Sequence, residues 1–442
     1  MEEHPQAPER IAPLGLMLKI PIPPALQHRR YRLLWLGLLI SIAGTRMQLA
    51  AVLWHISEIS PLPIALGAVG LMDILPVLVF SLLAGVFADS INRRRLILVT
   101  QTSMAMFAAL LGWATLSNRD SLWLIYAVMA ASASVSTFDL PARQALIPNL
   151  VPASVLTNAF SMNSIAFQLG SIAGPALAGL VLAHIGIGYA YVFNAVSYLA
   201  VIVALILMGP VEQERMVPAP IPGARSLLAG WRTSVTEGLS FVAHQPIILS
   251  SMLLDFFATF FSSATVLLPI FSKDILHVDV VGYGWLIAAP SVGAVLVAIV
   301  LTFSRQVPRQ GPVLLGAVAG FGVATIVFGL SRAFWLTYAA LVLTGATDGL
   351  STIIRNTVRQ LLTPDRLRGR MTSVNQIFFR GGPELGELEA GLLAQAFGPV
   401  VSVVSGGIGC ILATLWVWRR YPSIRHYTGD EPVRAGPQTV GG

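Results

Sequence analysis

Hydrophobic residues along the chain come in long uninterrupted runs, and most charged residues lie in the short stretches between them. A helix needs about 20 mostly apolar residues to cross a bilayer. The runs do not alternate apolar with polar residues, as the strands of a membrane barrel would, so they predict helices. The twelve predicted spans are Leu33–Ile56, Pro63–Phe87, Leu96–Leu116, Leu122–Phe138, Asn158–His184, Ala190–Met208, Ile247–Ile270, Gly282–Phe303, Pro312–Leu330, Trp335–Ile353, Val374–Phe397 and Val401–Trp418. The pattern indicates an all-α membrane protein.

The second half of the chain nearly repeats the first. Ser136–Pro148 reads S-T-F-D-L-P-A-R-Q-A-L-I-P, and Thr352–Pro364 reads T-I-I-R-N-T-V-R-Q-L-L-T-P. Further matches follow downstream, where Asn163, Gly170, Gly174, Ala178 and Gly179 correspond to Asn375, Gly382, Gly386, Ala390 and Gly391. Secondary transporters are commonly built from two such halves around a central site. The repeat therefore predicts a carrier with six helices in each half, residues 33–208 and 247–418.

Composition and charge fix the expected orientation. The chain is 55% hydrophobic and 11% charged, far from the range of soluble proteins. Of its 28 lysine and arginine residues, only Arg119, Lys273 and Arg332 fall in loops on the side opposite the termini, and Arg46 and Arg380 lie within spans. The remainder predict that both termini are cytoplasmic in a bacterial inner membrane. The net charge of +7 thus reflects topology, and we expect no nucleic-acid partner.

The segments outside the two halves predict little chemistry. We expect residues 1–32 and 419–442 to be cytoplasmic, with disorder over about the first 28 residues and after Tyr421. No cleavable signal peptide is expected. The cytoplasmic linker 209–246 contains an amphipathic stretch, Ser226–Val242, predicted to lie on the inner leaflet as a surface helix. Cys410 is expected to be a packing residue, and we expect a monomer.

A motif between the second and third spans points to a family. It reads Gly85-Val-Phe-Ala-Asp89-Ser-Ile-Asn92-Arg93-Arg94-Arg95, and it resembles the signature loop of the major facilitator superfamily. The sequence departs from that signature at Ser90, where a basic residue is usual, and at Asn92, where glycine is usual. A generic positive turn would explain the arginines but not the spacing of Gly85 and Asp89. The resemblance implies twelve helices in two pseudo-symmetric halves, with rocker-switch alternating access.

Other residues refine the resemblance. Asp139, Arg143, Arg355 and Arg359 lie near cytoplasmic span ends, where they are expected to form gate salt bridges. Gly170, Gly174, Pro175 and Gly179 resemble the exporter-type motif of the fifth span, which in that family lies between the halves; ordinary small-residue packing is the alternative. The phrase from Asp139 to Pro152 resembles the branch that contains the enterobactin exporter and macrolide efflux proteins.

Ionisable residues inside spans are costly and usually functional. Arg380, Glu384 and Glu387 form one stripe on the eleventh span, with Glu389 on its opposite face. The resemblance places the second and eleventh spans together at the seam between halves, which would bring Asp73 and the stripe within reach of a shared space. We expect Glu384, Glu387 or Asp73 to couple protons, with Arg46 and Arg380 as counter-charges. A static Arg380–Glu384 pair is the alternative. Asp255 and Asp348 are cargo-cavity candidates.

These features together predict proton-coupled export of a small amphiphilic molecule, such as a siderophore or a macrolide-like drug. A nutrient symporter and a transporter-like sensor or scaffold that moves nothing remain as alternatives. Nothing in the sequence indicates an enzyme, because a phosphate-binding Gly-rich loop is lacking and the seven histidines show no metal-ligand spacing. We expect neither a cofactor nor a metal, and the predicted partners are lipid, cargo and protons.

Overall fold

The computed structural model describes residues 22–211, 236, 239–304, 307–364 and 368–429, which form helices and contain no strand. The helices are α1 (Pro24–Gln27), α2 (Arg29–Ile59), α3 (Pro63–Ser90), α4 (Arg93–Leu116), α5 (Leu122–Leu146), α6 (Leu156–His184), α7 (Ile187–Met208), α9 (Pro246–Ser262), α10 (Leu268–Ile270), α11 (Val280–Phe303), α12 (Gln310–Leu330), α13 (Phe334–Leu362), α14 (Arg368–Phe397), α15 (Pro399–Arg420) and α16 (Pro422–Arg425). Short non-α turns are η1 (Ile147–Asn149), η2 (Ala153–Val155), η3 (Ala264–Leu267) and η4 (Phe271–Ile275).

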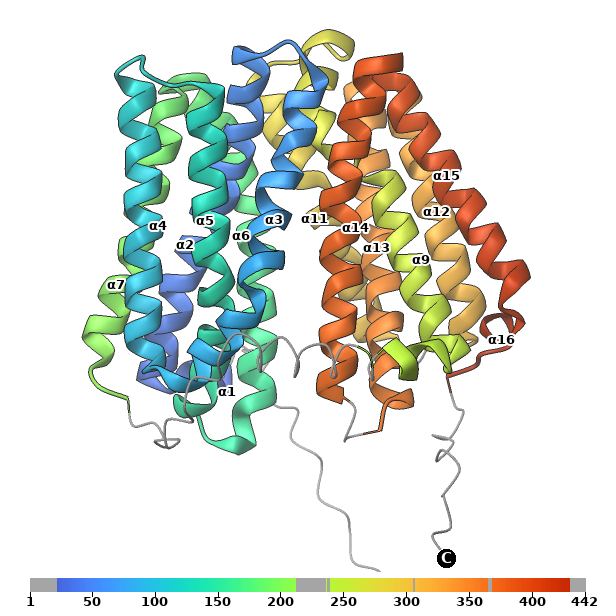
Figure 1. Ribbon diagram of the computed structural model, residues 1–442, viewed down its shortest axis with the longest axis horizontal. Coiled ribbons are helices and arrows are strands. Elements are labelled where there is room, and N and C mark those ends of the chain that lie inside the picture. Colours follow the sequence, from blue (N-terminus) through green and yellow to red (C-terminus); the bar gives the residue numbers. More distant parts are fainter. Residues whose placement is uncertain (1–21, 212–235, 237–238, 305–306, 365–367, 430–442) are drawn as a thin grey trace, which may run out of the picture.

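The helices form two bundles that stand side by side, α2 to α7 in one and α9 to α15 in the other (Figure 1). Within the described residues, 10 helices are long and apolar enough to cross a membrane. The long helices α13 and α14 fall outside that group, yet both pack among the others. The arrangement is consistent with the twelve-helix prediction and confirms an all-α membrane fold.

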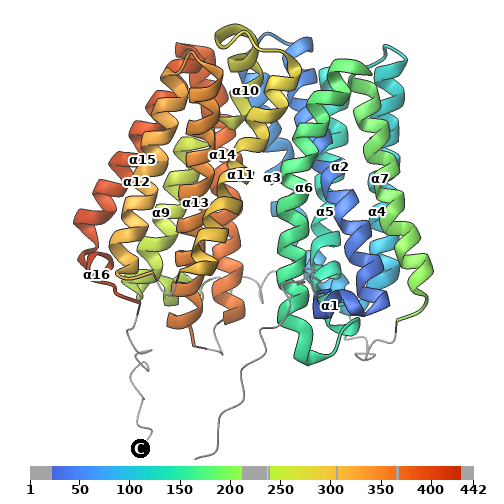
Figure 2. The same cartoon turned by 180° about the vertical axis from the view of Figure 1, so that it is seen from behind.

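Among the described residues, the two bundles share a hydrophobic core at one end only. One buried cluster joins the last turns of α2, including Trp54 and Ile56, to Leu267, Phe271 and Tyr283 of the other bundle. The buried clusters toward the opposite end each belong to a single bundle. α1 and α16 lie at that second end (Figures 1 and 2). The halves are therefore closed at the end opposite the described chain ends and separate toward the end predicted to be cytoplasmic.

Glycines allow the helices at this junction to touch backbone to backbone. A Cβ atom on Gly67 of α3 would lie 2.9 Å from the Cα of Gly391 in α14. On the other side of the molecule, a Cβ on Gly284 of α11 would lie 3.0 Å from the Cα of Gly179 in α6. Two glycine seams, α3–α14 and α6–α11, thus join the halves.

Some predictions about local structure were wrong. Residues 24–27 and 422–425 form α1 and α16 rather than disordered tails, because the Ala25 N–H donates to Asn158 Oδ1 at 3.0 Å and Ile424 is buried. The seventh span is not one continuous helix, since α9 ends at Ser262. Pro269, which lacks the N–H that a continuing helix needs, follows soon after. Most of the predicted surface helix at 226–242 lies outside the described residues.

Candidate functional site

The α3–α14 seam places the glutamate stripe against the other half. A Cβ on Gly70 would lie 2.3 Å from the carbonyl oxygen of Glu384 and 3.1 Å from the Cβ of Glu387. Both glutamates are half-buried, and Glu384 Oε2 is buried with no hydrogen-bond partner among the described residues. Asp73 follows Gly70 by one helical turn on α3, and its side chain is exposed. The three predicted proton-coupling carboxylates therefore lie along one seam.

Two arginines act on this carboxylate group. Asp73 experiences the positive charges of Arg380 and Arg46, and Glu387 experiences the negative charges of Asp73 and Glu384. The guanidinium of Arg46 lies over the Phe167 ring, 4.8 Å from its centroid. Among the described residues, none of the ion pairs closer than 4.0 Å joins Arg380 to Glu384. When the three carboxylates and the two arginines, Arg46 and Arg380, are all ionised, the group carries one net negative charge. A single proton would therefore make the group neutral.

The exporter-type motif on α6 faces two different partners. A Cβ atom on Gly170 would lie 3.0 Å from the backbone nitrogen of Ala43, and one on Gly174 would lie 2.6 Å from the Cβ of Arg46. These two glycines therefore allow α6 to pack closely against α2 of the same half. Pro175 and Gly179 instead lie against Gly284 of α11, across the seam. The second part of the motif thus lies at the α6–α11 seam, and the first part packs closely against α2.

The gate residues of the N-terminal half are linked within that half. Asp139 is fully buried, forms an ion pair with Arg143, and accepts hydrogen bonds from Thr100 Oγ1 at 2.6 Å and Gln101 Nε2 at 3.0 Å. From the start of α4, Arg93 donates to the carbonyl of Ala145 at 2.9 Å, and Arg94 to that of Leu205 at 2.9 Å. Gly85 and Asp89 lie in the last turns of α3, in a stretch whose side chains fall outside the described structure.

The C-terminal half carries a different ion pair at the repeat-related position. Arg355, which corresponds to Asp139, is 2% exposed and its Nη2 lies 2.9 Å from Asp255 Oδ1. The same nitrogen lies 3.5 Å from Asp348 Oδ1, and the Asp348 side chain is 47% exposed. Arg359, one turn further, contacts Asn356. Of the two cargo-cavity candidates, Asp255 is therefore buried in an ion pair with Arg355, and Asp348 forms a longer contact with the same arginine and is half-exposed.

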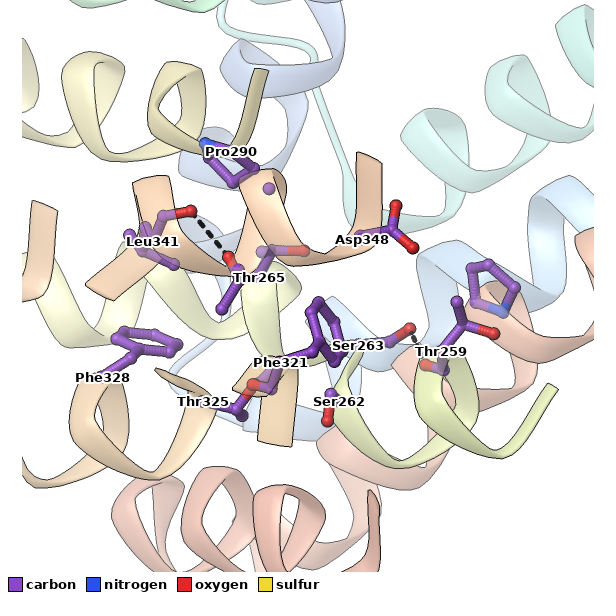
Figure 3. A pocket seen from close by; sticks show the side chains of 14 residues that line it. Thr259, Ser262, Ser263, Thr265, Pro290, Phe321, Thr325, Phe328, Leu341 and Asp348 are labelled. Carbon is purple, nitrogen blue, oxygen red and sulfur yellow. Dashed lines mark hydrogen bonds between the residues drawn. The ribbon is translucent and has the colours of Figure 1, made fainter. Parts of the chain in front are cut away.

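A cavity of about 160 Å³ lies beside Asp348, inside the C-terminal bundle (Figure 3). Its walls come from the end of α9, from η3 and from α11, α12, α13 and α14. Asp348 is the only ionisable residue among those that line it. The α14 residue in its wall is Pro383, which directly precedes Glu384.

Sequence reasoning missed the contacts that close the other end of the molecule. Lys273 in η4 donates to Ser57 Oγ at 2.8 Å, and its ammonium lies 4.2 Å from the centroid of the Trp54 ring. Tyr283 donates to the carbonyl of Ala50 at 2.8 Å, and its ring centroid lies 4.9 Å from that of Trp54. The available signal was that Lys273 is one of only two lysines in the chain.

Comparisons with known proteins agree with this architecture. The family described as transmembrane secretion effectors matches residues 21–426. The chain is 28% identical over 367 residues to the multidrug efflux pump Tap of Mycolicibacterium fortuitum, which covers 80% of this chain and 87% of the pump. It is 26% identical to the enterobactin exporter EntS of Citrobacter koseri, over 80% of this chain and 83% of the exporter.

Solved structures share the fold. A bacterial homologue of the lysosomal transporter Spinster, in an inward-facing and occupied conformation, has a TM-score of 0.67 at 17% identity and covers 91% of this chain and 99% of its own. A bacterial homologue of the iron transporter ferroportin, in an inward-facing state, has a TM-score of 0.65 at 17% identity, with coverage of 88% and 98%. At these identities the likeness describes the fold alone.

Proposed function

The chain belongs to the transmembrane secretion effector family of major facilitator transporters, and from this premise we propose that it exports a small amphiphilic molecule in exchange for protons. It is a multi-pass membrane transporter rather than an enzyme. Relatives named as a multidrug pump and an enterobactin exporter support outward transport of a drug-like or siderophore-like cargo. We further propose that both termini face the cytoplasm, so that the structure is open to the inside.

The observation that carries the proton coupling is the position of the carboxylates. Asp73, Glu384 and Glu387 lie along the α3–α14 seam that holds the halves together at the closed end. When all three are ionised, their mutual repulsion weakens this seam. A proton relieves that repulsion and favours the closed outer end, hence the inward-open state. Release of the proton inside and binding of cargo then favour opening outward.

Export from intact cells tests this proposal. Small molecules in the medium are compared by mass spectrometry, under iron limitation, for cells that lack, carry or overproduce the protein. Glu384→Gln imitates a permanently protonated carboxyl, so we expect export to fall about tenfold or more, equivalent to about 1.4 kcal/mol. The matched control is Glu389→Gln, on the opposite face of the same helix, for which we expect near wild-type export.

The outcomes separate the alternatives. A species that accumulates in the medium with protein level and decreases in Glu384→Gln supports coupled export. Accumulation inside the cells would indicate uptake instead. No transported species in either direction, with Glu384→Gln fully tolerated, would favour a sensor or scaffold.

A further inference from the structure

We propose that the cavity beside Asp348 is a subsite for a protonated primary amine at one end of the cargo, an inference that rests on the proposed export function. The cavity lies inside the C-terminal bundle, at the point where α9 ends and the chain continues as η3. Its volume of about 160 Å³ is smaller than the 300–1,000 Å³ of sites that enclose a whole drug-sized ligand. It therefore suits a head group, with the rest of the cargo lying in the space between the halves.

The charge of the cavity favours a cation. Asp348 is the only ionisable lining residue, and its carboxylate is half-exposed. The nearby Arg355 is buried and lies closer to Asp255, at 2.9 Å, than to Asp348, at 3.5 Å. Arg359, one turn further along α13, is also buried and is not among the lining residues. Asp348 Oδ1 thus accepts only a long hydrogen bond from Arg355, and its half-exposed carboxylate is the charged group on the cavity wall.

The hydroxyl groups of the cavity favour a ligand that donates hydrogen bonds. Four lining hydroxyls already donate to backbone carbonyls of their own helices: Thr259 to Asp255, Ser263 to Thr259, Thr325 to Phe321 and Thr344 to Leu341. Their oxygens can therefore only accept from a ligand. A primary ammonium offers three donors and no acceptor, which matches this set.

Other walls of the cavity suit the same group. The Phe321 and Phe328 side chains line it (Figure 3), and aromatic faces attract cations. The C-terminal end of α9 also lies at the cavity, and the end of a helix carries partial negative charge. Pro383 in the wall directly precedes Glu384, so the cavity and the α3–α14 seam are both built on α14.

Binding to the purified full-length protein tests the assignment. The probes are a dansyl group joined through a pentyl chain to a primary amine, and the same molecule ending in a hydroxyl. Binding is followed by dansyl fluorescence in detergent, without a proton gradient. We expect Asp348→Asn to weaken binding of the amine about tenfold or more, because a charged hydrogen bond is lost, and to leave the alcohol unchanged.

Two further variants sharpen the test. Asp274→Asn removes an exposed carboxylate of the same half that does not line the cavity, and it should leave both affinities unchanged. Thr265→Val removes a lining hydroxyl at nearly constant shape and should weaken the amine about threefold. Equal wild-type affinity for amine and alcohol, or an amine affinity insensitive to Asp348→Asn, would overturn the assignment even if cells export cargo. An amine that binds as expected supports the assignment even if cells export nothing, and only the export proposal then fails.

Discussion

Arg355 holds a buried positive charge whose two acidic neighbours differ sharply in exposure. Asp255 is 2% exposed and lies 2.9 Å away, whereas Asp348 is half-exposed and lies 3.5 Å away. Removing the charge of Asp255 leaves the buried Arg355 guanidinium without its nearest acidic partner. Loss of one partner of a buried ion pair lowers the free energy of unfolding by about 3 to 5 kcal/mol. Asp255→Asn should therefore lower the thermal stability of the detergent-purified protein markedly.

Asp348→Asn is the matched comparison, since an exposed pair contributes about 1 kcal/mol or less. Its melting temperature should stay close to that of the wild type. Equal destabilisation by the two variants would contradict the assignment of Asp255 as the structural partner of Arg355.

At the residue scale, sequence predicted which charges lie in the membrane but not every pairing among them. The i,i+4 spacing of Asp139 and Arg143 brought those two together on one helix. Asp255 and Arg355 come from α9 and α13, so their pairing depends on how these helices pack. The spacing of residues along the sequence does not predict such packing. The exposed side chain of Asp348 was likewise indistinguishable in sequence from the buried one of Asp255.

At the element scale, the α3–α14 seam depends on glycine. A Cβ on Gly70 would lie 2.3 Å from the carbonyl oxygen of Glu384, so Gly70→Ala must push the helices apart. We expect export to fall about tenfold. A loss of about 1.4 kcal/mol in the stability of the state with a closed outer end changes the population of that state, relative to the open one, by about tenfold. Gly381→Ala on α14 is the control, since a Cβ there meets nothing within 4 Å. Export that is equal in the two variants would show that close approach at this seam is unimportant.

Hydropathy predicted most helices but not where a helix breaks or extends. The run 247–270 is predominantly apolar, yet α9 ends at Ser262, in a segment where Thr259, Ser262, Ser263 and Thr265 offer competing hydroxyl groups. Conversely, α13 continues beyond its predicted span to Leu362 and carries Arg355 and Arg359 within the helix. The cavity at the end of α9 could not be predicted, because it exists only where that break meets α12 and α13.

At the scale of the whole molecule, Lys273 of the C-terminal half makes non-covalent contacts with the N-terminal half. Its ammonium contacts Ser57 and the Trp54 ring, contacts that together contribute about 1 to 2 kcal/mol. Lys273→Gln should shift the outer end toward opening by about fivefold to thirtyfold in population. Spin labels on exposed Asn118 and Arg332, in turns at the closed end of each half, would report a longer distance by electron paramagnetic resonance.

Lys273→Arg retains the charge and serves as the control, with distances close to those of the wild type. An unchanged Asn118–Arg332 distance in Lys273→Gln would show that the lysine does not hold the closed end. The sequence repeat predicted two halves, but contacts between them, such as this one, have no periodic signature.

The most direct test of the account is the distance between the open ends as pH changes, which needs no identified cargo. Labels on Gln144 and Gln360, exposed and repeat-related residues of α5 and α13, measure it in lipid nanodiscs. Acidification should populate the longer distance, since protonated seam carboxylates favour the inward-open state, and alkaline pH should shorten it. Glu384→Gln should keep the longer distance at every pH. A distance that changes with pH equally in the wild type and in Glu384→Gln, or not at all in the wild type, would contradict switching by the α3–α14 carboxylates.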